Sequence, residues 1–198
     1  MRWRIAMGQV SLLLCLAIGP ALAQTDVEKT AAVLRASNCS ACHGGTGDSP
    51  TATVPRLNGQ NAAYLRSRLE SFRYPIREAP RMIHGMGHLS PQLTTGVIAE
   101  LAKFYAGQPP PSQAGSDNKL GAAIYRTGAK DIPACRGCHG ERGEGQGGVP
   151  RLAGQHEEYL RLQLQGFAMA ARIADPMNHH VWMMKPEQAD AVAAYLAN

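Results

Sequence analysis

Apolar residues recur at the spacing of an α-helix along most of the chain. One stripe in residues 61–72 consists of Tyr64, Leu65, Leu69 and Phe72. The same spacing recurs later, at Tyr159, Leu160, Leu164 and Phe167. Further helices are predicted over residues 27–36 and after Ser90-Pro91 and Lys185-Pro186, because proline is favoured in the first turn of a helix. No segment alternates apolar and polar residues between hairpin turns, so the pattern predicts an all-α fold.

The first 23 residues have the pattern of a secretory signal peptide. Arg2 and Arg4 precede an apolar run over residues 10–18, and Ala21-Leu22-Ala23 provides a small-x-small cleavage sequence. The run is short for a membrane span, so cleavage after Ala23 is favoured over a retained anchor. Cleavage removes Cys15 and leaves four cysteines, in a compartment where disulfides can form.

The remainder of the chain is a tandem repeat. Residues 54–60 read VPRLNGQ and residues 149–155 read VPRLAGQ, an offset of 95, and a Tyr-Leu pair follows each copy. Such self-similarity indicates one structural unit used twice. The Pro- and Gly-rich segment between the copies is typical of a linker. We therefore expect an N-terminal domain over residues 24–106, a linker over 107–118 and a C-terminal domain over 119–198.

All four remaining cysteines lie in two C-x-x-C-H motifs, at Cys39, Cys42 and His43 and at Cys135, Cys138 and His139. This spacing is the attachment signature of c-type haem. One helical turn presents both thiols to the haem vinyl groups and the adjacent imidazole to the iron.

Other readings of the motifs explain less of the sequence. Structural zinc needs four ligands, which the cysteines could supply, but the adjacent histidines and the repeat would then be unexplained. A thioredoxin-like redox site requires a βαβ context, which is absent here. The two motifs therefore predict two covalently bound haem c groups, one in each repeat. A domain of roughly 85 residues is marginal without such a group.

These motifs, the Pro-Arg-Leu-x-Gly-Gln segments and the Tyr-Leu pairs resemble two tandem class I cytochrome c domains, and more narrowly the dihaem cytochrome c4 family. The resemblance covers nearly all of the chain after residue 23. It implies helical domains that each enclose one haem. It also implies that the carbonyl groups of Pro55 and Pro150 accept hydrogen bonds from His43 and His139, which orients the rings. Arg56 and Arg151 are candidates to pair with haem propionates.

A class I domain closes the second face of the iron with a methionine that precedes the last helix. The repeat offset pairs Met82 with Met177 and preserves no other methionine pair, so we expect these two as axial ligands. The rivals are His84 and His179, which the same offset also pairs. The remaining methionines, Met86, Met183 and Met184, are expected to pack or to contact the haem edge.

The charge is shared unequally between the repeats. Residues 24–112 hold nine Lys or Arg against six Asp or Glu, whereas residues 113–198 hold nine of each. Haem propionates would make both domains more negative, and the two N-terminal arginines inflate the isoelectric point, so nucleic-acid binding is not expected. This unequal charge distribution would affect the rate of encounter with redox partners more than it would affect the final binding affinity.

The resemblance implies a periplasmic carrier of single electrons, from a quinol-oxidising complex or a dehydrogenase to a terminal oxidase. It is compatible with peripheral association at the membrane. Two irons closed on both faces leave no open position for a substrate, so the expected role is not enzymatic. The alternatives are a cytochrome subunit of a periplasmic dehydrogenase and a small dihaem redox enzyme, which would need one haem with an unusual sixth ligand.

Overall fold

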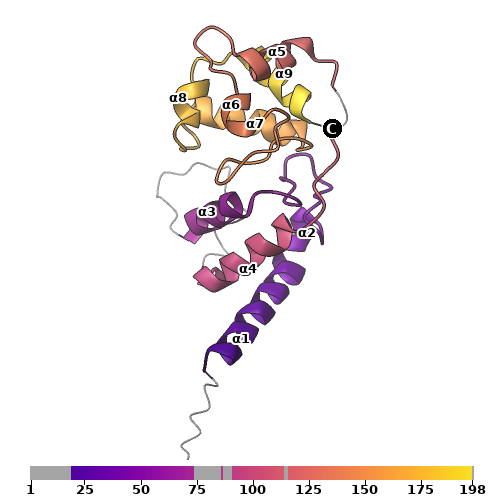
Figure 1. Ribbon diagram of the computed structural model, residues 1–198, viewed down its shortest axis with the longest axis vertical. Coiled ribbons are helices and arrows are strands. Elements are labelled where there is room, and N and C mark those ends of the chain that lie inside the picture. Colours follow the sequence, from indigo (N-terminus) through magenta and orange to yellow (C-terminus); the bar gives the residue numbers. More distant parts are fainter. Residues whose placement is uncertain (1–18, 74–85, 87–90, 114–115, 198) are drawn as a thin grey trace, which may run out of the picture.

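Two helical units lie one above the other along the long axis of the molecule (Figure 1). The computed structural model describes residues 19–73, 86, 91–113 and 116–197. Within these residues there is no strand, and the only β-type pairings are two isolated bridges, Ala129–Ile132 and Gln146–Val149. The prediction of an all-α fold is therefore confirmed for the described residues.

In its described residues, the N-terminal domain contains four α-helices and one π-helical turn. These are α1 (Gly19–Leu34), the π-helix η1 (Arg35–Cys39), α2 (Ser40–His43), α3 (Ala62–Arg73) and α4 (Thr95–Ala106). Helix α4 buries Val97, Ile98 and Leu101, which form a cluster with Ala31 and Leu34 of α1. This apolar cluster joins the first and last described helices of the domain.

Five α-helices form the part of the C-terminal domain that the structure describes. They are α5 (Lys119–Thr127), α6 (Arg136–His139), α7 (Glu157–Ala168), α8 (Met177–Val181) and α9 (Pro186–Leu196). Ile124 and Tyr125 of α5 are fully buried against Val192 and Leu196 of α9. The first and last helices therefore pack together here as they do in the N-terminal domain.

One of the two expected proline-initiated helices is present. Helix α9 begins at Pro186, as predicted. The expectation for Ser90-Pro91 is wrong, because α4 begins only at Thr95. The Thr94 hydroxyl accepts a hydrogen bond from the Val97 amide at 3.3 Å and caps α4, whereas residues 91–92 form a separate 3₁₀ turn.

Some expectations fall outside the described residues. Residues 1–18, which hold most of the expected signal peptide, are among them, as are Met82 and His84. Helix α1 begins at Gly19, before the expected cleavage position at Ala23. Among the described helices, none combines the length and the apolar character that crossing a membrane requires.

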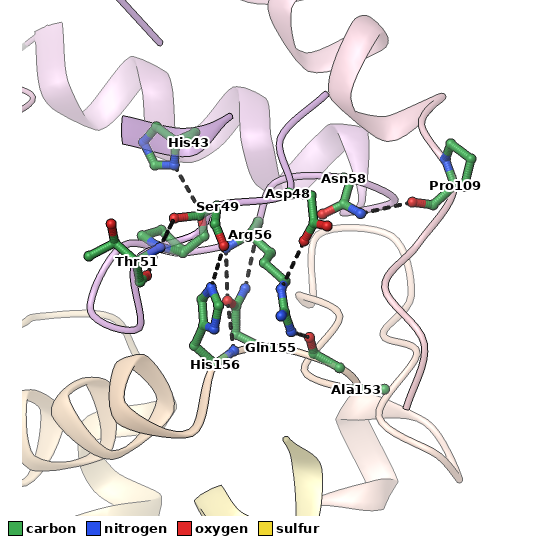
Figure 2. A network of polar contacts seen from close by, with 12 residues as sticks. His43, Asp48, Ser49, Thr51, Arg56, Asn58, Pro109, Ala153, Gln155 and His156 are labelled. Carbon is green, nitrogen blue, oxygen red and sulfur yellow. Dashed lines mark hydrogen bonds and ion pairs between the residues drawn. The ribbon is translucent and has the colours of Figure 1, made fainter. Parts of the chain in front are cut away.

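The linker packs on the glycines of both repeated motifs. A Cβ atom on Gly59 would lie 2.5 Å from Pro110, and one on Gly154 would lie 2.8 Å from the Ser112 carbonyl oxygen. Both glycines have positive φ, so a larger residue there would be strained as well as crowded. Asn58 donates to the Pro109 carbonyl at 2.9 Å (Figure 2). The linker therefore follows the domain boundary in close contact with both units.

Candidate functional site

The N-terminal motif lies at the end of a continuous helical path. Helix α1 runs through η1 into α2, so Cys39, Cys42 and His43 are presented on successive turns. His43 is 8% exposed, Cys39 is partly buried and Cys42 is exposed. Cys39 packs against the apolar cluster that α1 and α4 form. The motif therefore joins the core of its domain to the surface.

The C-terminal motif is reached differently. Helix α5 ends at Thr127, and a loop closed by the Ala129–Ile132 bridge precedes α6. The outcome is nevertheless the same, because His139 is buried, Cys135 is partly buried and Cys138 is exposed. Each domain therefore presents one inner sulfur, one outer sulfur and one buried imidazole.

Each motif histidine is held through one ring nitrogen. His43 Nδ1 lies 2.9 Å from the Pro55 carbonyl oxygen (Figure 2), and His139 Nδ1 lies 3.0 Å from the Pro150 carbonyl oxygen. A carbonyl oxygen only accepts, so Nδ1 must carry the proton in both rings. The lone pair of each neutral ring is then on Nε2, which makes no hydrogen bond to any described residue. Both histidines are arranged to bind a metal through Nε2.

Burial sets the protonation states of these groups. It lowers the pKa of His43 and of His139, and the hydrogen bonds to the proline carbonyls oppose this effect. Burial also raises the pKa of Cys39 and raises that of Cys135 to about 11. The imidazoles are therefore neutral at pH 7, as metal ligation requires.

The arrangement of the cysteines argues against the other readings of the motifs. None of the four motif cysteines is joined in a disulfide, so neither motif closes on itself. In the described part of the chain, no three His, Cys, Asp or Glu side chains come together as a metal site. The four cysteines lie in two separate domains and do not form one zinc site.

A partly buried cation between the domains fits an anionic cofactor. Arg172 donates to the Tyr64 hydroxyl at 3.0 Å and to the Gln163 side chain, and its Nε is buried without a partner. No described carboxylate pairs with Arg172. The pKa of the neighbouring Arg68 is lowered mainly by burial and, to a smaller extent, by the positive charge of Arg172. This uncompensated positive charge fits an anionic group such as a haem propionate.

The two arginines expected to bind propionates have partners within the protein. Arg56 Nε lies 3.0 Å from Asp48 Oδ1 (Figure 2), and its Nη1 donates to the Gly154 carbonyl at 2.6 Å. Arg151 Nε donates to the Ala153 carbonyl at 3.1 Å. Arg172, which the sequence does not single out, pairs with no carboxylate in the described residues. It is therefore a better candidate to bind an anionic group than Arg56 or Arg151. Its counterpart in the repeat, Arg77, lies outside the described residues.

The C-terminal candidates for a sixth ligand differ in their surroundings. Met177 begins α8 and packs, partly buried, against the same apolar cluster as Cys135. His179 is exposed and lines an open surface cavity of about 560 Å³ with His180 and Trp182. Met184 is buried in the core, and Met86 of the N-terminal domain packs against the cluster that includes Cys39.

Two glutamines of the repeated motif make contacts that no sequence expectation included. Gln60 and Gln155 are each 6% exposed, and each bonds to the backbone of the other domain. His156 also crosses the boundary, with Nε2 2.9 Å from the Ser49 carbonyl oxygen. The available signal was the glutamine at the same position of both copies, five residues after the proline that holds the motif histidine.

Comparisons with known proteins agree with this geometry. The Cytochrome c family model matches residues 27–101 and 118–198. Cytochrome c4 of Pseudomonas aeruginosa is 34% identical over 172 residues, which are 84% of this chain and 83% of that protein. A protein of Stutzerimonas stutzeri strain A1501 named thiosulfate dehydrogenase electron acceptor is 34% identical over 208 residues, 99% of this chain and 94% of its own length.

A solved structure shows the same two-domain architecture. Cytochrome c4 of Acidithiobacillus ferrooxidans superposes with a TM-score of 0.75 at 36% identity, and the match covers 81% of this chain and 98% of that one. Family, fold and the two histidine sites lead to the same conclusion. The chain belongs to the cytochrome c4 family, and it is an electron carrier with one haem c in each of its two domains.

Proposed function

We propose that each haem iron is held between a histidine and a methionine, His43 with Met82 and His139 with Met177, while the four motif cysteines form thioethers. The observation that carries this proposal is the pair of Nδ1–H to proline carbonyl bonds, which leave both Nε2 atoms for iron. Met177 is supported over His179 because it packs with Cys135, whereas His179 faces solvent. When bound, the haem supplies a one-electron ferric–ferrous couple, and methionine ligation raises its potential.

The protein carries single electrons in the periplasm, where it is exported by the signal peptide over residues 1–23. It does not catalyse a reaction itself, because both faces of each iron are closed. The donor is a quinol-oxidising complex or a dehydrogenase, and the acceptor is a terminal oxidase. The relative named thiosulfate dehydrogenase electron acceptor supports a dehydrogenase that oxidises thiosulfate as the donor to test first.

The axial ligands are tested by near-infrared absorption of the oxidised holoprotein. We expect Met177→Ala and Met82→Ala each to remove half of the far-red methionine-to-ferric-iron band, and the double variant to remove all of it. The potential of the affected haem should fall by about 0.2 V, part of the roughly 0.8 V range that axial ligands span. The matched control is His179→Ala, which should leave the band and both potentials unchanged. The proposal fails if the oxidised wild-type protein lacks the band, or if Met177→Ala leaves it unchanged while His179→Ala shifts the potential of the C-terminal haem.

The donor is tested by anaerobic rapid mixing. Oxidised holoprotein is mixed with a purified thiosulfate dehydrogenase and thiosulfate, and haem reduction is followed by visible absorption. Reduction of both haems within the turnover time of the dehydrogenase supports this donor. Reduction that requires a separate cytochrome would exclude it.

A further inference from the structure

One peptide group of the N-terminal domain is hydrogen-bonded at both ends. The Pro55 carbonyl accepts from His43 Nδ1 at 2.9 Å. The N–H of the same peptide group, on Arg56, donates at 2.8 Å to Gln155 Oε1 from the C-terminal domain. Figure 2 shows Gln155 reaching Arg56 from below, with His43 on the far side. A side chain of one domain is therefore one peptide group away from the motif histidine of the other.

The arrangement is reciprocal. The Pro150 carbonyl accepts from His139 Nδ1 at 3.0 Å, and the N–H of Arg151 donates at 2.7 Å to Gln60 Oε1 from the N-terminal domain. Gln60 and Gln155 occupy the same position of the repeated motif. Each glutamine reaches across to the peptide group that holds the histidine of the opposite domain.

Both glutamines are fixed in this orientation by further bonds. Gln155 Nε2 donates to the Arg56 carbonyl at 3.0 Å, and Gln60 Nε2 donates to the Arg151 carbonyl at 2.8 Å. Each Oε1 also accepts from the amide of the next residue, Asn61 or His156. With Nε2 donating to a carbonyl and Oε1 accepting from amides, an amide flip would place like groups together at every contact. The acceptor atom therefore faces the Pro–Arg peptide in both domains.

Hydrogen bonds in a chain polarise one another. When an acceptor bonds to the N–H of a peptide, the carbonyl oxygen of that peptide becomes more negative and accepts more strongly. A stronger acceptor at Nδ1–H makes the imidazole a better donor to iron through Nε2. A better donor stabilises the ferric state and lowers the reduction potential.

We propose that Gln155 is a positioning residue for the haem of the N-terminal domain, and Gln60 for the haem of the C-terminal domain. Each acts across the domain boundary through a Pro–Arg peptide and lowers the potential of the opposite haem. The inference rests on the proposed ligation of iron by His43 and His139.

Adjacent contacts provide matched controls for a purely structural role. Asn61 follows Gln60 and donates to the Val149 carbonyl, and His156 follows Gln155 and bonds to the Ser49 carbonyl. Both cross the same boundary to a backbone oxygen, but neither contacts the N–H of a Pro–Arg peptide. If the glutamines only hold the domains together, Asn61→Ala and His156→Ala should have comparable effects.

The test uses the holoprotein with two measurements on each variant. A spectroelectrochemical titration gives both potentials, and proton NMR of the diamagnetic ferrous state gives the Nδ1–H shifts of His43 and His139, each assigned to its own haem. We expect Gln155→Met to raise only the N-terminal potential and to move only the His43 Nδ1–H signal upfield. Gln60→Met should do the same only for the C-terminal haem and His139. The shift in the reduction equilibrium should be up to about tenfold, which is 59 mV for one electron.

Gln155→Glu tests the acceptor atom without removing it. Glutamate has nearly the same shape and keeps an oxygen toward the Arg56 N–H, and its protonated carboxyl group can still donate to the Arg56 carbonyl. At a pH where this group is protonated, the His43 Nδ1–H signal should therefore stay near its wild-type position. This variant also keeps the inference testable if the methionine variants do not fold. A Gln155→Glu protein with the signal moved upfield would overturn the proposal.

Other outcomes also decide the question. A shift on the haem of the same domain, equal shifts on both haems, or the same shift in the Asn61→Ala and His156→Ala controls would overturn the proposal. Failure of the ligation itself is distinguishable, because the wild-type ferrous protein would then lack haem-shifted histidine ring signals. Crossed single-haem shifts with unaffected controls would support the cross-domain role.

Discussion

The two domains build the same helix crossing with glycine on opposite helices. In the N-terminal domain, Gly96 of α4 faces Val27 of α1. In the C-terminal domain, Gly121 of α5 faces Ala191 of α9, although residue 191 is the repeat counterpart of residue 96. The fold therefore requires a close approach of the first and last helices. The glycine that permits this approach can lie on either helix.

Each domain also has a buried tyrosine, which lies on the last helix in one domain and on the first helix in the other. Tyr105 comes from the last helix of the N-terminal domain, lies in an apolar cluster that Cys39 packs against, and has a buried hydroxyl without an oxygen or nitrogen partner in the described residues. Tyr125 comes from the first helix of the C-terminal domain and donates to the Gly140 carbonyl at 2.5 Å. The two domains therefore support the same motif with different contacts, and matched variants can separate them.

The largest expected difference is at the helix crossing. A Cβ atom on Gly121 would overlap the Ala191 carbonyl oxygen and lie 2.6 Å from its carbon, both part of a helix backbone that cannot easily move. We expect Gly121→Ala to lower the free energy of unfolding by about 3 kcal/mol through overpacking. The contact at Gly96 is with the Val27 side chain at 3.0 Å, and alanine favours the helix. Gly96→Ala should therefore change stability by less than about 1 kcal/mol.

Guanidinium unfolding of both holoproteins, followed by circular dichroism, measures this pair. Equal losses in the two variants would show that the crossings are equally tight and would remove the distinction between the domains.

The tyrosine hydroxyls should differ by a smaller amount. Tyr125→Phe removes a buried hydrogen bond and should cost about 1–2 kcal/mol. Tyr105→Phe removes a hydroxyl whose neighbour is the weakly accepting Cys39 sulfur, so the change should be under about 0.5 kcal/mol. The same unfolding measurement applies. A larger loss for Tyr105→Phe than for Tyr125→Phe would contradict the contacts described for the two domains.

The smallest effect concerns pH and the domain boundary. Burial lowers the pKa of His156 from its ordinary value of 6.5, and the Ser49 carbonyl opposes the shift. A lowered histidine pKa means that the unfolded chain takes up the proton first, so stability is present above pH 6.5 and falls as the pH drops below that value. His156 is partly exposed, so the loss should be less than about 1 kcal/mol.

The variant His156→Asn places at this position the residue that the N-terminal repeat has, Asn61, and removes the titratable ring. Unfolding free energies measured from pH 8 to pH 5 should then fall less steeply than in the wild type. An unchanged slope would assign the pH dependence to other groups.

The sequence predicts the parts of this molecule that depend on local patterns. Helical spacing, the repeat and the two C-x-x-C-H motifs are sufficient for the all-α fold and the haem sites, because periodicity and motif spacing are local properties. The expected start of α4 at Ser90-Pro91 is wrong because the helix is capped further along the chain. There the Thr94 side chain accepts a hydrogen bond from the Val97 amide. Gln60, Gln155 and Arg172 were missed as functional residues because their partners lie about 90 to 110 residues away along the chain.

The central claim, that each domain attaches one haem through its own cysteine pair, is tested most directly by the mass of the exported protein under denaturing conditions. We predict the mass of residues 24–198 plus two haems, with one haem lost in a Cys39→Ala/Cys42→Ala variant and the other lost in a Cys135→Ala/Cys138→Ala variant. A mature polypeptide that carries no added haem, or a single haem shared between the two cysteine pairs, would contradict the account.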